Sequence, residues 1–415
     1  MEIQEGDLIM RIAADMTSLS DNLSGLERYA FCLVSEMIGF GRDKWYLVVK
    51  NEVPERVKRL KRTYPDRVCL VHVSGGKLMV NQVKLPLVMS NIKADAYLFP
   101  SFPVPLLFGN AFGCQCAHGR QSGKIYSLIA DAAVMDVPET MKLKSRLLFG
   151  LGYRHSVSVC KSIITISHFS EKRIRKHFKN VRNIIYAPCG VVSGHMDGCA
   201  GRIGAGAYSS GTKCAGEDSL GSSEKAWAYI KKKYGLPEKY ILVLSTLEPR
   251  KNIGQVFSAY ADFVIKNTDA PKLVVAGRKG WLVDEELASI KENFSDRICI
   301  TGFIDDDDLK SVYSHADFFV DASVYEGFGM PPVEALANGV RHVLVSDIPA
   351  HREVLGEDAV YFKLHDVKGL SAKMALLYRD NTEQQTEPAC LRKYSWKKSA
   401  ENVYRQMQAY NKNFS

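Results

Sequence analysis

The most distinctive stretch of the chain is SVYEGFGMPPVE, residues 323–334, in which two carboxylates flank a glycine-rich turn. An apolar, strand-like run at 317–321 precedes the turn, and the two prolines suit the first turn of a helix, where a missing N–H has no partner to lose. Glycines let the backbone approach a ligand closely, and the N–H groups at a helix start favour an anion. We therefore expect Glu326, in the turn, and Glu334, in the helix, to contact different parts of one anionic ligand.

Two adjacent cations, Arg250 and Lys251, lie in the segment STLEPRKNI at 245–253, between a strand-like run and a helical stretch. Arginine binds phosphate oxygens in a fork, and lysine supplies a compact point charge. In parallel α/β folds, ligands bind beyond the carboxyl ends of the strands. We therefore expect this pair to face a diphosphate in the same cleft as Glu326.

The spacing Glu326-x7-Glu334 within EGFGMPPVEALA resembles the signature of the retaining glycosyltransferases of family GT4, which have the GT-B fold. The resemblance implies that Glu326 faces the hydroxyls of a donor sugar and that Glu334 binds the ribose hydroxyls. It also implies that amides of Gly327 to Met330 support the sugar and phosphate, and that Lys251 neutralises the departing diphosphate.

Weaker matches follow the family order along the chain. Ser24-Gly25-Leu-Glu-Arg-Tyr29 resembles a loop that faces the donor phosphate, and Thr301-Gly302-Phe303 resembles a turn near the nucleotide base. Thr246 stands where many members carry an arginine, so we expect Arg250 to contribute more charge here. The predicted donor-binding residues are Gly25, Thr246, Arg250, Lys251, Phe303, Glu326, Gly327, Phe328, Gly329, Met330 and Glu334.

The segment Ile129-Ala130-Asp131 departs from the family, which often has His-Asp at this place. The histidine is replaced by Ala130 and the aspartate remains. We predict Glu326, Lys251, Arg250 and Asp131 as the catalytic residues. His118 is the alternative source of an imidazole, although an ordinary loop histidine is the preferred interpretation.

The four aspartates at 305–308 superficially match a metal-binding motif. An apolar-periodic stretch follows at once, so we interpret Asp305 as a helix N-cap with Asp308 at the third helical position. The ten cysteines show no zinc spacing. We predict no metal and no cofactor, with a nucleoside-diphosphate sugar as substrate.

The elements that position these residues are short apolar runs alternating with helical stretches such as 25–39, 168–178 and 395–411. This alternation predicts an α/β fold with parallel sheets covered on both faces. The predicted strands are 8–14, 45–49, 68–73, 95–99, 162–166 and 183–187 in the first half, and 240–245, 272–276, 297–301, 317–321, 342–345 and 359–362 in the second.

A change of composition divides the two halves. Glycine and serine dominate residues 193–223, and apolar periodicity disappears there, which predicts a flexible insertion or linker. We expect GT-B architecture, with two doubly wound Rossmann-like domains facing across a cleft: an acceptor-binding domain at 1–192 and a nucleotide-sugar-binding domain at 224–394. The resemblance implies that the helix in 395–415 crosses back to the first domain.

Composition limits the location and the partners. The 415 residues are 46% hydrophobic and 24% charged, with a net charge of +9, no long apolar run and no signal-like start, so we expect a cytoplasmic protein. Basic runs at 56–67 and 172–182 and the apolar segment 98–108 suggest, as an alternative to solvated faces and a buried loop, peripheral contact with an anionic membrane or a lipid-linked acceptor. The basic runs lack interleaved aromatics, which argues against nucleic acid.

The resemblance implies a function. We expect transfer of a hexose-type sugar, with mannose weakly favoured, from a nucleoside-diphosphate sugar to a glycan or polyprenyl-linked glycan acceptor in cell-surface polysaccharide synthesis. Same-face substitution is the favoured route to retention. The alternatives are a non-transferring GT-B enzyme such as a sugar-nucleotide epimerase, and a catalytically weak sugar-nucleotide-binding protein.

Overall fold

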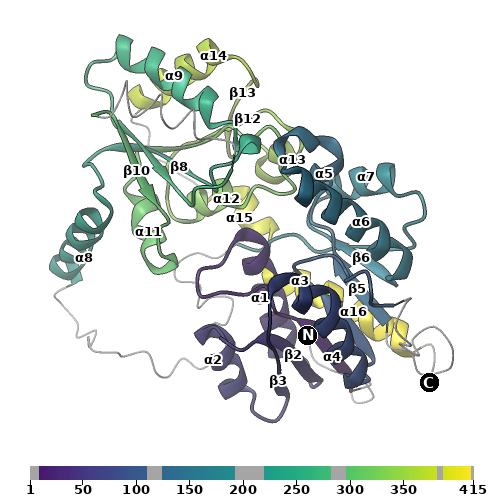
Figure 1. Cartoon of the computed structure of the whole chain (residues 1–415). Helices are drawn as coiled ribbons and strands as arrows, with labels where there is room; N and C mark the ends of the chain where they lie inside the picture. Colours follow the sequence, from purple (N-terminus) through teal and green to yellow (C-terminus); the bar gives the residue numbers. More distant parts are fainter. Residues whose placement is uncertain (1–8, 110–123, 192–218, 282–295, 381–386, 413–415) are drawn as a thin grey trace.

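Two parallel β-sheets, each covered by helices, make up the part of the protein that the structure describes (Figure 1). The structure is a computed structural model, and it describes residues 9–109, 124–191, 219–281, 296–380 and 387–412. The predicted arrangement of two doubly wound α/β units is confirmed. His118 and residues 193–218 of the predicted linker lie outside the described residues.

The first sheet has seven strands in the order β3-β2-β1-β4-β5-β6-β7. Every strand pairs in parallel with its neighbours. Its strands are β1 (Arg11–Asp15), β2 (Lys44–Lys50), β3 (Val68–Val73), β4 (Ala96–Phe99), β5 (Lys124–Leu128), β6 (Ser162–Thr165) and β7 (Ile184–Tyr186).

The second sheet has six strands in the order β10-β9-β8-β11-β12-β13, again parallel throughout. Its order reverses between β8 and β11, and this reversal is where a doubly wound sheet opens a crevice for a ligand. Its strands are β8 (Tyr240–Leu244), β9 (Lys272–Ala276), β10 (Ile298–Gly302), β11 (Phe318–Asp321), β12 (Val343–Ser346) and β13 (Val360–Phe362).

Helices cover both faces of each sheet, so the central strands β4, β6, β11 and β12 are buried at every position. The helices of the first unit are α1 (Gly25–Phe40), α2 (Glu55–Thr63), α3 (Lys77–Met79), α4 (Leu85–Ile92), α5 (Ala133–Asp136), α6 (Leu143–Val159) and α7 (His168–His177), with a π-helical turn at Val80–Lys84. Those that follow are α8 (Ser219–Tyr234), α9 (Ile253–Lys266), α11 (Asp306–Ser314), α12 (Met330–Ala337), α13 (Pro349–Leu355), α14 (Val367–Arg379), α15 (Ala389–Lys393) and α16 (Trp396–Lys412).

Three predictions about these elements need correction. Strand β5 was not predicted, because its run KIYSL contains Ser127, which is fully buried and interrupts the apolar pattern. Residues 219–223, assigned to the linker, are helical because α8 begins at Ser219. In the segment 98–108, Leu98, Phe99, Val104 and Phe108 are buried in the core and do not form an exposed apolar surface.

The aspartates at 305–308 behave partly as predicted. Asp305 is the N-cap of α11 by position, but its side chain makes no capping hydrogen bond. The carboxylates of Asp305 and Asp308 instead accept hydrogen bonds from Lys233 Nζ, each at 2.7 Å. A cation from the neighbouring helix α8 therefore takes the place of the backbone donors that a capping box would use.

The last helix, α16, connects the two halves of the molecule by lying against α1 and β7 of the first unit (Figure 1). The Trp396 ring packs edge-on against Tyr29 at 5.4 Å between centroids. Asn402 Nδ2 donates to the Tyr186 carbonyl at 2.7 Å. None of the described helices is both long and apolar enough to cross a membrane.

A second junction between the units is built on Asp136, at the end of α5. Its carboxylate accepts hydrogen bonds from Arg173 and His177 of α7, and from the hydroxyl of Tyr325 at 3.0 Å. Tyr325 belongs to the turn after β11, in the second unit. Burial by itself would raise the pKa of Asp136, but the hydrogen bonds from Arg173, His177 and Tyr325 lower it to about 2.

We predict that Asp136→Asn lowers the midpoint of thermal unfolding, because the variant loses the charge that these three donors share. The folded-state pKa of about 2 lies below the ordinary value of 3.8, so the stabilisation is complete above about pH 5 and is lost as the pH falls toward 2. The difference in unfolding midpoint between wild type and variant should therefore be largest at pH 6 and become progressively smaller at pH 4 and pH 3.

The matched control is Asp296→Asn, which removes a carboxylate whose side chain is 82% exposed. It should shift the midpoint little at any pH. An Asp136→Asn gap of constant size from pH 6 to pH 3 would contradict the assigned role of the carboxylate.

Candidate active site

The residues predicted to carry charge chemistry come from two turns that follow adjacent strands. Arg250 and Lys251 form a 3-10 turn shortly after β8, and Glu326 lies in the turn after β11. Because β8 and β11 are hydrogen-bonded neighbours in a parallel sheet, both turns lie at the same edge. A backbone hydrogen bond from Val324 N to Arg250 O, at 2.9 Å, joins the two turns directly.

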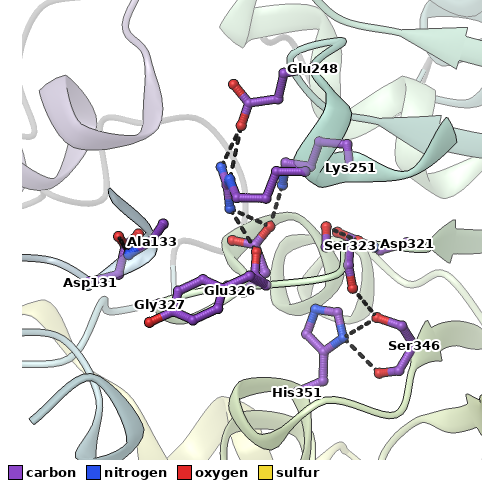
Figure 2. A network of polar contacts seen from close by, with 12 residues as sticks. Asp131, Ala133, Glu248, Lys251, Asp321, Ser323, Glu326, Gly327, Ser346 and His351 are labelled. Atoms are coloured by element: carbon purple, nitrogen blue, oxygen red, sulfur yellow. Dashed lines mark hydrogen bonds and ion pairs between the residues drawn. The ribbon is translucent and has the colours of Figure 1, made fainter. Parts of the chain in front are cut away.

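Glu326 is held between the two cations, as Figure 2 shows for Lys251. Its Oε1 accepts from Lys251 Nζ at 2.6 Å and lies 3.0 Å from Arg250 Nη1. Glu248 binds the other side of the arginine, with Oε1 at 2.7 Å from Nη2 and 3.0 Å from Nε. Two carboxylates and two cations thus form one continuous cluster.

The cluster lies away from solvent, since Glu326, Lys251 and Glu248 are each less than 10% exposed. Burial alone would raise the pKa of Glu326, but the positive charges of Arg250 and Lys251 hold it well below its usual range. Glu326 is therefore an anion at neutral pH. Burial also acts against the charge on Arg250, but Glu326 and Glu248 raise its pKa further above its ordinary value.

Asp131 comes from the first unit and lies across from this cluster, past the end of β5 (Figure 2). Its Oδ1 accepts from Ala133 N at 2.9 Å. A Cβ placed on Gly327 would lie 2.9 Å from Asp131 Cβ and 3.0 Å from the Ala130 carbonyl. Gly327 is thus the residue that lets the turn after β11 approach the first unit. Burial raises the pKa of Asp131, against the lowering effect of Arg250.

The glycine-rich turn leads into α12 with the geometry that its sequence predicts. Gly329 is the residue before the helix and has φ of +87°, a left-handed conformation that favours glycine. The prolines stand in the first turn of the helix. The buried Phe328 ring packs edge-on against Tyr394 at 5.0 Å, which fixes the turn on the second unit.

His351, at the start of α13, is a site residue that the sequence analysis missed. It is fully buried, and a Cβ on Gly329 would lie 3.2 Å from its Nε2. Its Nδ1 lies 3.0 Å from the Ser346 carbonyl (Figure 2), and Nε2 has no hydrogen-bond partner among the described residues. The feature that could have identified His351 is its position, because it follows β12 by a short turn and β12 is the neighbour of β11.

Glu334 lies on α12 and is engaged from the first unit. Arg28 of α1 donates from Nη1 to Glu334 Oε1 at 2.7 Å and from Nη2 to Asp306 at 2.6 Å. The Tyr313 hydroxyl is 3.3 Å from Glu334 Oε2. Arg28 was not among the predicted site residues, although it stands in the quoted segment 24–29.

Gly25 meets the same region through Met330. A Cβ on Gly25 would lie 3.3 Å from Met330 Cε, and Met330 lines a small hollow together with Glu334 and Arg28. The predicted loop of the first unit therefore lies against the first turn of α12, beside the predicted ribose carboxylate.

Phe303 and Thr246 lie at the edge of this region. The Arg278 guanidinium lies 4.6 Å from the centre of the half-buried Phe303 ring and donates to the Asn22 carbonyl of the first unit at 2.7 Å. Thr246 is exposed, and its Cγ2 would be 3.2 Å from a Cβ on Gly280.

The structure therefore brings Glu326, Lys251 and Arg250 into direct contact, with Asp131 beside Gly327. Glu334, Gly25 and Met330 form a neighbouring group along the same turn and helix. Within the described ranges, no three His, Cys, Asp or Glu side chains are grouped as a metal ion would require.

Comparison with known proteins identifies the second unit. Residues 229–393 match the family model described as glycosyl transferases group 1. The serotype-specific mannosyltransferase WbdA of Escherichia coli is 34% identical over 148 residues, which are 35% of this chain and 18% of that protein. The O-antigen chain mannosyltransferase B of Escherichia coli is 32% identical over 163 residues, 39% of this chain and 42% of that protein. The matched part thus spans less than half the length of these relatives.

Solved structures share the fold over nearly the whole chain. A sucrose-phosphate synthase from Thermosynechococcus elongatus superposes with a TM-score of 0.67 at 16% identity, covering 96% of this chain and 99% of that one. HepE from Anabaena, solved with UDP and glucose, gives a TM-score of 0.63 at 13% identity, covering 96% and 100%. The chain therefore has the GT-B fold, and its residues 229–393 match the glycosyl transferases group 1 family.

Proposed function

We propose that the chain is a retaining hexosyltransferase that uses a nucleoside-diphosphate sugar as donor. The observation that carries this proposal is the buried contact of Glu326 with Lys251 and Arg250 at the sheet edge of a group 1 domain. Relatives described as O-antigen mannosyltransferases favour mannose as the sugar and a cell-surface glycan as the product. A third relative, from Campylobacter jejuni, is described by its action on a diphospho-undecaprenol-linked sugar and supports a lipid-linked glycan as acceptor.

In this proposal, Lys251 and Arg250 receive the donor diphosphate. The oxygens of the diphosphate replace part of the contact that the two cations now make with Glu326, so positive charge stands where negative charge develops in the transition state. The C1–O bond to the diphosphate breaks while the acceptor oxygen bonds to C1 on the same face. The departing phosphate takes the acceptor proton. Since the cations supply the stabilising charge, we propose that no metal ion is needed.

The geometry around Glu326 favours same-face substitution over a double displacement. A nucleophilic carboxylate must donate electron density to the anomeric carbon, and the two cations on Glu326 Oε1, which hold the pKa of the group well below its usual range, make it a weak nucleophile. We assign Glu326 to the sugar hydroxyls. Asp131, beside Gly327, is placed to orient the sugar or the incoming acceptor from the first unit.

The test is a screen of nucleoside-diphosphate sugars that measures released nucleoside diphosphate, with and without glycan acceptors. We expect one donor, mannose-bearing, to give release that requires an acceptor. Release without transfer, or conversion of the donor sugar to an epimer, would point to a non-transferring enzyme. Donor binding without any turnover across the acceptor panel would point to a binding protein.

With that donor, we predict that Lys251→Ala lowers kcat roughly 100- to 1,000-fold, the effect of removing one preorganised charge donor from a developing anion. The matched control is Lys266→Ala on α9, whose side chain is 63% exposed and pairs with Asp262. The control should keep wild-type kinetics, and both variants should be checked for cooperative thermal unfolding. Wild-type-like turnover of a folded Lys251→Ala protein would overturn the assignment.

We predict a different kinetic signature for Glu334→Gln. If Glu334 accepts hydrogen bonds from the ribose diol in ground state and transition state alike, loss of its charge should raise the donor KM about tenfold and leave kcat nearly unchanged. Glu238→Gln, at a side chain that is 79% exposed, is the control. A loss confined to kcat would move Glu334 out of the ribose site.

A further inference from the structure

A concave apolar site lies in the first unit, outside the charged cluster. Its volume is about 300 Å³, at the lower end of the range of about 300–1,000 Å³ that is typical of small-molecule sites. The lining includes Leu78, Phe102, Val104, Leu106, Leu148 and Phe149. We call this hollow the apolar pocket. None of its lining residues takes part in the contacts of Glu326 or Glu334 described above.

The walls of the apolar pocket are held in place by specific contacts. Val104 N donates to Ser156 Oγ of α6 at 2.9 Å, and Leu106 N donates to Gln82 Oε1 of the π-helical turn at 3.0 Å. Where α6 meets the loop after β4, a Cβ on Gly152 would lie 2.8 Å from Pro103 Cβ, so the helix and the loop are in close contact. The loop after β4 is therefore held by hydrogen bonds to both flanking helical segments, and these bonds define the shape of the pocket between them.

A row of aromatic rings leads from the apolar pocket toward the candidate active site. The Phe102 and Phe149 rings are 6.1 Å apart between centroids, and Phe149 is 5.9 Å from Tyr153. Tyr153 lies on α6, which packs against α5, the helix that begins two residues after Asp131. Asp131 in turn lies beside Gly327. Helix α6 therefore contributes to the apolar pocket and also contacts the segment that supplies Asp131.

The charged side chain of the pocket lining is a cation. Lys77 lines the pocket together with the neutral polar residues Asn81, Gln82 and Ser145. The two segments that supply these residues, α6 and 74–92, contain no aspartate or glutamate. Leu78 and Leu148 also line the pocket and have 70% and 49% of their surface exposed, so apolar surface continues outward beside Lys77. A ligand that complements this surface has an apolar chain joined to an anionic group.

We propose that the apolar pocket binds the hydrocarbon chain of a lipid phosphate or diphosphate, which is the lipid portion of the acceptor. The identification of this lipid as the acceptor rests on the proposed function, whereas binding of the lipid chain itself requires no turnover. The apolar pocket differs from the surface expected from the sequence, since much of the apolar segment 98–108 is core and only Phe102, Pro103, Val104 and Leu106 line the pocket.

The test uses dodecyl phosphate, below the concentration at which it forms micelles, titrated into the full chain by calorimetry. Leu148→Asp places a negative charge in the mouth, and we expect it to weaken binding about tenfold or more. Leu151→Asp is the matched control: it is the same substitution on the same helix, at a side chain that is 51% exposed and outside the pocket. It should change affinity less than about twofold.

Several outcomes would overturn the proposal. The first is the absence of saturable binding to the wild type. The second is an equal loss in both variants, which would indicate adsorption along the exposed apolar face of α6 and not binding in the pocket. The third is equal affinity for butyl phosphate, which would indicate a phosphate site without a chain site. Nucleoside-diphosphate binding should be unchanged in Leu148→Asp. If no donor gives acceptor-dependent release of nucleoside diphosphate while dodecyl phosphate still binds, the proposed function fails and the pocket stands. If transfer to a water-soluble glycan is intact without dodecyl phosphate binding, only the pocket fails.

Discussion

The candidate active site depends on one buried carboxylate shared by two cations. Placing Glu326, Lys251 and Arg250 out of water carries a desolvation cost of several kcal/mol per ion, which is recovered only if each charge keeps its partners. The sheet makes this possible, because β8 and β11 are neighbours and deliver the two turns to one edge. Glu248 then satisfies the remaining side of Arg250. In the proposed function a diphosphate would bring its own negative charge to this cluster, so the cations would exchange one anion for another and remain paired.

Charged side chains are also paired with hydrogen-bond partners across the boundary between the two units. Arg28 joins α1 to Glu334 and Asp306, Asp136 joins α5 and α7 to Tyr325, and the Glu353 carboxylate accepts from the first amides of α7 at 2.7 Å. Tyr325 and Glu334, which take part in two of these contacts, flank the glycine-rich turn. A ligand that displaces Arg28 from Glu334 would weaken this contact, so under the proposed function donor binding and the relative position of the units are energetically linked. The linkage follows from shared contacts and requires no separate switch.

The sequence was informative wherever a local rule set the structure. Twelve of the thirteen described strands coincide with predicted apolar runs, and the turn at 326–330 has the left-handed glycine and the N-terminal prolines that its residues favour. The failures arise where partners are distant. Strand β5 contains a buried serine, Asp305 and Asp308 pair with Lys233 from α8 rather than with the nearby backbone, and His351 joins the site only because β12 lies beside β11. No spacing in the sequence encodes such neighbours.

The same contrast explains why most predicted donor-binding residues fall within two short motifs, whereas the pocket proposed for the acceptor was not predicted. A diphosphate and a ribose present the same groups in every nucleotide sugar, so two turns can carry a compact motif for them. The apolar pocket is instead assembled from the π-helical turn, the loop after β4 and α6. The run 98–108 looked uniformly apolar, yet folding divided it between the core and a pocket mouth. Which part of an apolar run stays accessible is decided by packing against segments about fifty residues away, so the shape of the apolar pocket is a property of the folded first unit.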